Sequence, residues 1–112
     1  MTIFEKIANR EIPAKIEYED ADFLAFHDTN PQAPVHVLIV PKRCIVRIGE
    51  ALPEDADLLG RMLAASGKIA RQLGVFDSGY RLVINHGPDA GESVPHLHIH
   101  LLASRKLGWP PG

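Results

Sequence analysis

The chain has 112 residues, a formal charge of -2 and 46% hydrophobic residues. These values are typical of one folded domain over residues 1–112, and they exclude a disordered, collagen-like or bare coiled-coil protein. The acidic balance argues against a nucleic-acid partner bound mainly through its phosphates, and no apolar run approaches the roughly 20 residues that span a bilayer. We therefore expect a cytoplasmic protein without a membrane partner, for which small anionic ligands remain open.

A short helix is predicted at the start of the chain, followed by two short strands. Thr2 and Glu5 have the spacing of a capping box, in which the threonine side chain accepts from first-turn amides and the glutamate reaches back. Pro13 should end this helix. Strands are then expected over residues 14–19 and 23–27, with a turn between them.

The middle of the chain is predicted to hold a central strand and the longest helix. After a loop over residues 28–34, residues 36–40 are almost continuously apolar, as in a strand that is covered on both faces. The helix should begin at Pro53 and stop at Gly74. Its apolar residues recur at intervals of three and four, so one helical face should pack on the sheet.

The last third of the chain is predicted to form a strand over residues 80–85, a glycine-bearing loop over 86–95 and a final strand over 96–103. Strands separated by short turns, with only two helices, favour the α+β class. We expect an antiparallel sheet of about five strands.

Three of the six histidines, His96, His98 and His100, alternate with apolar residues in the final predicted strand. Because side chains along a strand point alternately to opposite faces, the imidazoles should share one face and the apolar residues should pack against the long helix. Two protonated neighbours about 6.6 Å apart would repel by roughly 2.5 kcal/mol at an effective dielectric near 20. The row should therefore be mostly neutral until an anion arrives.

A face of neutral imidazoles suits more than one kind of chemistry. It suits nucleophilic or acid/base chemistry on a phosphate, with one imidazole attacking and its neighbours donating hydrogen bonds. It also suits metal binding, since His-x-His is a ligand spacing, although no close cysteine pair or Glu-x-x-His accompanies the row. A solvent-exposed row without function is the third interpretation, and spacing alone does not decide between the first two.

The segment His96-Leu-His98-Ile-His100-Leu-Leu102 resembles the signature of the histidine triad (HIT) family. Other segments resemble the Hint branch of this family and together cover almost the whole chain: Phe4, Pro13-Ala-Lys-Ile16, Phe26-His-Asp28, Pro31-Gln-Ala-Pro34-Val-His36, Pro41-Lys42, Asn85, Gly91, Ser93 and Trp109-Pro-Pro-Gly112. The resemblance implies a HIT-like fold and a homodimer with one continuous sheet. It also implies a purine nucleoside phosphoramidase, which cleaves a P–N bond and releases AMP or GMP and an amine without a metal or other cofactor.

The resemblance also assigns catalytic roles residue by residue. His98 matches the nucleophile, which forms a nucleotidyl-histidine that water then hydrolyses, so that two easier steps replace one. His96 and His100 match the flanking residues, and His36 matches a fourth imidazole near the phosphate. Ser93 matches the residue that contacts the leaving atom.

The nucleotide-binding residues follow in the same way. Asn85, Val94 and the backbone around Gly91 match phosphate and leaving-group contacts, and Asp28 matches the carboxylate that accepts from the ribose hydroxyls. The residues that match the purine slot are Phe4, Ile7, Phe26, His27 and Leu38. From the residues alone, Asp28 is as well explained as a turn cap, and the aromatic and aliphatic residues of the slot as core.

The chain departs from the Hint pattern at three informative positions. Cys44 stands where a histidine is frequent, Pro95 where an aromatic residue is common, and Thr29 where a larger apolar residue is usual. Neighbouring basic residues would lower the pKa of a reactive Cys44 thiol, but a small buried thiol is the commoner case. The rival functions are a non-catalytic purine-nucleotide-binding or interaction protein, a metal-dependent hydrolase and a dinucleoside polyphosphate hydrolase.

Overall fold

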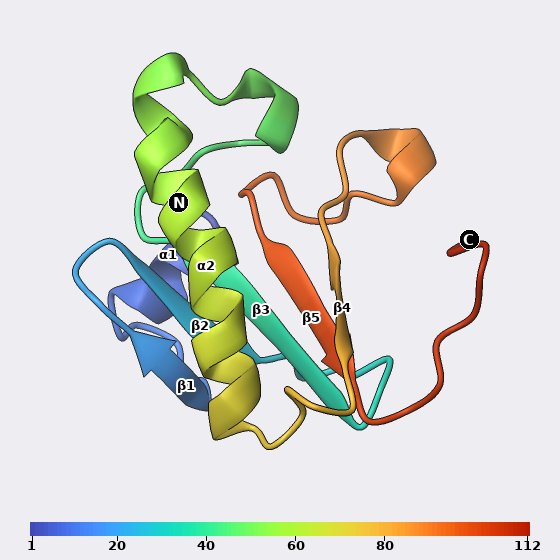
Figure 1. The fold of residues 1–112 in the computed structure, drawn as a ribbon. Coiled ribbons are helices and arrows are strands. Elements are labelled where there is room, and N and C mark those ends of the chain that lie inside the picture. The colour runs from blue at the N-terminus through green and yellow to red at the C-terminus, as the bar shows by residue number, and fades with distance from the viewer.

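The computed structural model describes residues 1–112 as one antiparallel sheet in the order β1-β2-β3-β5-β4, with a helix against each face (Figure 1). The predicted α+β class, with five strands and two helices, is confirmed. The elements are α1 (Ile3–Ala8), β1 (Ile16–Glu19), β2 (Phe23–His27), β3 (Val35–Pro41), α2 (Ala56–Gln72), β4 (Tyr80–Val83) and β5 (Ile99–Ala103). Three single 3₁₀ turns lie between them: η1 (Ile48–Glu50), η2 (Pro53–Asp55) and η3 (Pro88–Ala90). None of the helices is both long and apolar enough to cross a membrane.

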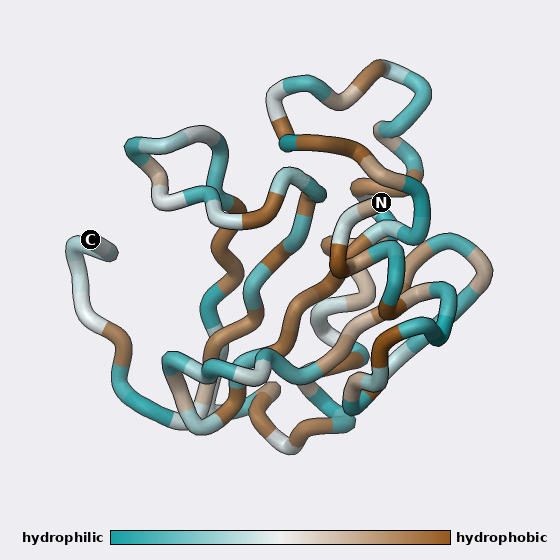
Figure 2. Tube along the Cα trace, turned by 180° about the vertical axis from the view of Figure 1, so that it is seen from behind, coloured by the Kyte–Doolittle hydropathy of each residue, from teal (hydrophilic) through white to brown (hydrophobic).

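The two faces of the sheet bury separate hydrophobic clusters. The larger cluster joins α2 to alternate residues of the strands, namely Phe23, Ala25, Val37, Ile39, Ile99, Leu101 and Ala103. The smaller cluster joins Phe4 and Ile7 of α1 to Leu24, Phe26, Leu38 and Val40 on the opposite face. Viewed from behind, hydrophobic residues follow the central strands, and the outer turns are mostly hydrophilic (Figure 2). The central strand β3 is therefore covered on both faces, as its sequence predicts.

The final strand is shorter than predicted. Its ladder with β3 begins at Ile99, which pairs with Ile39, so continued pairing would set Leu97 opposite Pro41. Proline has no N–H for a ladder, and the chain turns away here. Instead, the Leu97 amide donates to the carbonyl of Ile45 at 2.6 Å. Side-chain alternation nevertheless continues, since Leu97 joins the α2 core and His96 and His98 lie on the α1 side.

Other boundaries differ from the prediction by a few residues. β1 begins at Ile16 rather than at residue 14, and β4 ends at Val83 rather than at residue 85. Pro53 begins a 3₁₀ turn, and the α-helix proper begins at Ala56. Beyond β5 the chain leaves the body of the protein (Figure 1), and Trp109 is 83% exposed.

Candidate active site

A cleft of about 440 Å³ lies on the α1 side of the sheet, and residues distant in the sequence line it. Its predicted site residues are Phe4, Ile7, Phe26, His27, Asp28, His36, Leu38, Ser93, Val94, His98 and His100. Three other predicted site residues, His96, Asn85 and Gly91, do not line it. The structure thus brings most of the predicted constellation together in one cavity.

One half of the cleft is apolar. Phe4 and Phe26 meet edge to face with ring centroids 5.6 Å apart, and Ile7 and Leu38 complete this wall. Such a slot can hold a flat heteroaromatic ring by contact area. Sequence reasoning missed further lining residues, namely Ile3, Ile12, Pro13, Ala14, Asn30 and Gln32. The spacing of Ile3, Phe4 and Ile7 could have indicated Ile3, because the three share one helical face. The segment around Pro13 matches the family pattern but carries no local sign of a role in the site.

His98 has the geometry of a nucleophile. Its Nδ1–H donates to the carbonyl oxygen of His96 at 2.8 Å, which leaves the lone pair on Nε2. The ring is 7% exposed, lines the cleft and packs edge to face against Phe4 at 5.1 Å and His100 at 4.9 Å. A neutral imidazole held in one tautomer presents an unprotonated nitrogen to an electrophile.

The sequence suggested an open row of imidazoles, but His96 is fully buried and packs against Phe4 of α1. Its Nε2–H donates to the Pro41 carbonyl at 2.8 Å, and its Nδ1 accepts from the Thr2 hydroxyl at 2.8 Å. The same hydroxyl accepts from the Glu5 amide in the predicted capping box. His96 therefore supports the site through its carbonyl oxygen and its packing on Phe4 rather than by touching a ligand.

A chain of hydrogen bonds fixes the other two imidazoles. The Gln32 amide donates to His36 Nδ1 at 3.0 Å, which requires the proton of a neutral His36 on Nε2. That Nε2–H donates to His100 Nδ1 at 2.9 Å, so His100 carries its own proton on Nε2. The backbone thereby sets both tautomers, and His100 keeps a donor for a ligand in the cleft.

Burial keeps these imidazoles neutral near pH 7. It lowers the pKa of His36 and of His96 below their ordinary value. Burial, together with the neighbouring His98 and His36, lowers the pKa of His100 to about 4. For His96 and His100, these directions agree with the prediction of a mostly neutral row.

The polar rim of the cleft has mixed functions. Asp28 lines the cleft, but one carboxylate oxygen already accepts from the Asn30 amide at 2.8 Å, as a turn cap does. Its other oxygen lies 3.5 Å from His36 Nε2. His27 Nε2–H donates to a carboxylate oxygen of Glu17 at 2.9 Å. Asp28 therefore both caps the turn and lines the cleft.

Asn85 and Gly91 lie outside the cleft. Asn85 follows β4 and is half-buried, and Gly91 is exposed at the end of η3. The backbone at Gly91 has φ of 84°, a left-handed conformation that favours glycine. This glycine therefore shapes the turn that leads to Ser93.

Two side-chain groups bring possible metal ligands within 4.8 Å of one another: Asp28, His36 and His100, and Glu5, Cys44 and His96. In the first group a metal at His36 Nε2 would need a proton on Nδ1, where the Gln32 amide already donates. In the second, Thr2 already donates to His96 Nδ1. Both groups are committed to internal hydrogen bonds, which favours chemistry by the imidazoles themselves.

Cys44 is exposed, so the expectation of a buried thiol is wrong. The sulfur contacts the Pro95 carbonyl at 3.6 Å. Desolvation around the sulfur and the charge of Glu5 raise the pKa of the thiol, opposite to the lowering expected for a reactive cysteine. Cys44 also lies outside the cleft.

Comparisons with known proteins identify the family of this domain. A family model described as HIT domain matches residues 9–107. A HIT-like protein from Synechocystis is 53% identical over 111 residues, covering 99% of this chain and 96% of the relative. A HIT family hydrolase from Legionella pneumophila superposes with a TM-score of 0.96 at 45% identity, with complete coverage of both chains. A histidine triad nucleotide-binding protein from Candida albicans superposes with a TM-score of 0.82 at 31% identity, covering 98% of this chain and 83% of that one.

Proposed function

This chain belongs to the HIT domain family, and on that premise we propose that it hydrolyses the P–N bond of purine nucleoside 5'-phosphoramidates, as in the Hint branch. Aminoacyl-adenylates are a related substrate class. The observation that carries the proposal is the geometry of His98, whose Nδ1–H donates to a backbone carbonyl while the ring lines the cleft. No metal or other cofactor is required by this chemistry.

The reaction runs in two displacements at the α-phosphorus. His98 Nε2 attacks phosphorus, the P–N bond breaks, and the leaving amine takes up a proton that the Ser93 hydroxyl at the cleft relays from solvent water, so that the serine keeps its own proton. Water then attacks the resulting nucleotidyl-histidine, which releases the nucleoside monophosphate and restores the neutral imidazole. His100 donates from Nε2 to a phosphoryl oxygen as negative charge grows on it, and the hydrogen bond from His36 Nε2 to His100 Nδ1 keeps that donor in place.

The rest of the cleft suits a purine nucleotide. The wall of Phe4, Phe26 and Leu38 has the apolar surface that a purine ring buries, and it offers few polar groups to discriminate adenine from guanine. Asp28 has one carboxylate oxygen available to accept from the ribose hydroxyls. AMP and GMP derivatives are therefore both proposed as substrates.

The homodimer is also part of this proposal. β4 is an edge strand with one unpaired side, and the adjacent helix α2 exposes Leu63 (44%), with Phe76 (40%) just beyond it. A second copy paired along β4 would continue the sheet and cover these apolar side chains. Light scattering of the purified protein should give twice the monomer mass, and a monomer at all concentrations would contradict it.

The decisive experiment is release of AMP from adenosine 5'-phosphoramidate in the presence of a chelator. The parent should turn over, and His98→Ala should lose at least about 10³-fold in kcat while retaining AMP binding by calorimetry. A parent that binds AMP without turnover would be a nucleotide-binding protein instead. Activity that appears only after zinc is added would favour the metal-dependent rival, and preference for dinucleoside polyphosphates would favour the other hydrolase.

A further inference from the structure

The loop between β4 and β5 carries Ser93 and Val94 to the cleft without strand pairing of its own. It contains η3 and two glycines with positive φ, Gly87 at 83° and Gly91 at 84°. The backbone hydrogen bonds around η3 stay within the turn, so side-chain contacts must hold the turn against the rest of the protein. The residue next to Ser93 provides such a contact.

Glu92 is bound on both carboxylate oxygens. Arg47 donates to it twice, from Nε at 2.9 Å and from Nη2 at 2.7 Å, and the Gly87 amide donates at 3.0 Å. The Glu92 side chain is only 10% exposed and that of Arg47 is 30% exposed. This is a bidentate, mostly buried ion pair, unlike the exposed pairs on α2.

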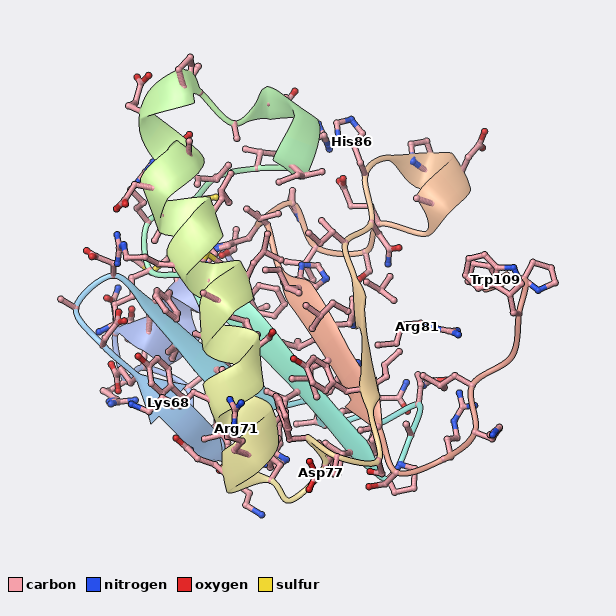
Figure 3. All side chains as sticks on the ribbon, viewed as in Figure 1. Lys68, Arg71, Asp77, Arg81, His86 and Trp109 are labelled. Carbon is pink, nitrogen blue, oxygen red and sulfur yellow. The ribbon has the colours of Figure 1, made fainter.

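The segment that bears Arg47 is itself fixed to the core. Ile45, two residues earlier, is buried and accepts from the Leu97 amide at 2.6 Å. Two residues after Arg47, the Gly49 amide donates at 3.1 Å to Nδ1 of His86, which belongs to the β4–β5 loop, so a second contact joins the same two segments. Figure 3 shows the His86 side chain projecting from the start of this loop toward the η1 segment. Arg47 therefore links the loop to a rigid neighbour.

We propose that Arg47 is a positioning residue that acts through Glu92 to hold Ser93 at the cleft. The kinetic consequences of this inference rest on the proposed function. The contact between the two segments is independent of that function. The purine slot is built from α1, β2 and β3, away from this pair. Loss of Arg47 should therefore impair departure of the amine more than binding of the nucleotide.

Steady-state kinetics with adenosine 5'-phosphoramidate provides the first test. We expect Arg47→Ala to lower kcat by about 10- to 100-fold, the scale of a small misplacement, and to leave KM within about threefold. Arg47→Lys should recover part of the loss because an ammonium group makes a single contact. Arg61→Ala is the matched control, since Arg61 pairs with Asp57 and Asp22 on the α2 side, and it should change neither constant.

A double variant tests whether the effect passes through Ser93. Arg47→Ala combined with Ser93→Ala should be no slower than the slower single variant, because both remove the same interaction. Effects that multiply fully would overturn the proposal, as would an Arg47→Ala enzyme with the parent's kcat.

Hydrogen exchange separates this proposal from the proposed function. Arg47→Ala should speed exchange of the Gly87 and Glu92 amides while α2 amides exchange as in the parent. If the parent does not turn over, the proposed function fails, and faster loop exchange still supports the positioning role. Unchanged exchange in Arg47→Ala overturns the positioning role whatever the activity.

Discussion

The two faces of the sheet are built from alternate residues of the same strands, but different helices cover them. On one face the 17-residue α2 seals the larger of the two hydrophobic clusters. On the other, the six-residue α1 covers only part of the strands and leaves the cleft beside it. The face under the long helix buries most of the hydrophobic residues, and the face under the short helix carries the imidazoles that line the cleft.

The last strand shows this division most clearly. Leu97, Ile99 and Leu101 are at most 3% exposed and lie under α2. His98 and His100 lie between them and point to the α1 side, where the short helix shields them in part and leaves the cleft open. Residues of the short helix consequently serve both as core and as wall of the site, which makes α1 the place where stability and ligand binding should be coupled.

The largest expected effect comes from Thr2, which caps α1 and donates to the fully buried His96. Thr2→Ala should cost about 1 kcal/mol for the lost cap and about 1 kcal/mol or more for the buried imidazole nitrogen left without a donor. Urea unfolding would measure the loss, and Thr2→Ser, which keeps the hydroxyl, should behave as the parent. A Thr2→Ala protein as stable as the parent would show that α1 is not held by this contact.

A paired substitution then compares the two faces directly. Phe4→Leu and Phe23→Leu each remove an aromatic ring from a buried position, with expected costs of about 1 kcal/mol in unfolding free energy. Only Phe4 lines the cleft and contacts His98, so only Phe4→Leu should weaken AMP binding, by about 3- to 10-fold. Equal weakening by Phe23→Leu, measured by calorimetry, would contradict the separation of the faces.

The sequence was sufficient where the determinants are local. Alternation places the histidines and their apolar neighbours on opposite sides, and the spacing of Thr2 and Glu5 identifies the capping box. Local patterns could not show that Pro41 cuts the last ladder short, because this depends on the register of β3 with β5. For the same reason they gave no sign that α1 buries His96.

Local sequence patterns also did not predict the contacts between distant segments. The pair of Arg47 with Glu92 joins residues 45 positions apart, and nothing in either local sequence specifies a bidentate contact. The Gln32 amide that sets the tautomer of His36 depends on how one loop folds back. Family resemblance could indicate which imidazoles meet, but for His36 and His100 only the structure shows which nitrogen carries the proton.

The last comparison of the two faces uses the pH dependence of the free energy of unfolding. Burial lowers the pKa of His100 from 6.5 to about 4 in the folded protein, so below pH 6.5 the unfolded chain binds the proton more tightly and unfolding is favoured. This contribution is fully present above about pH 6.5 and is lost as the pH falls toward 4. Between pH 7.5 and 5.5, above the range in which most carboxylates titrate, His100 alone should account for a loss of about 1 kcal/mol.

Urea unfolding at the two pH values measures this loss. The lowered pKa values of His36 and His96 add to it in the same direction. His100→Gln should reduce the pH dependence because it removes one of the titrating imidazoles, while Phe23→Leu, which alters only the α2 face, should leave it intact. If the unfolding free energy of the parent is the same at both pH values, the imidazoles on the α1 side are not desolvated. The cleft would then be the only difference between the α1 face and the α2 face that bears on reactivity.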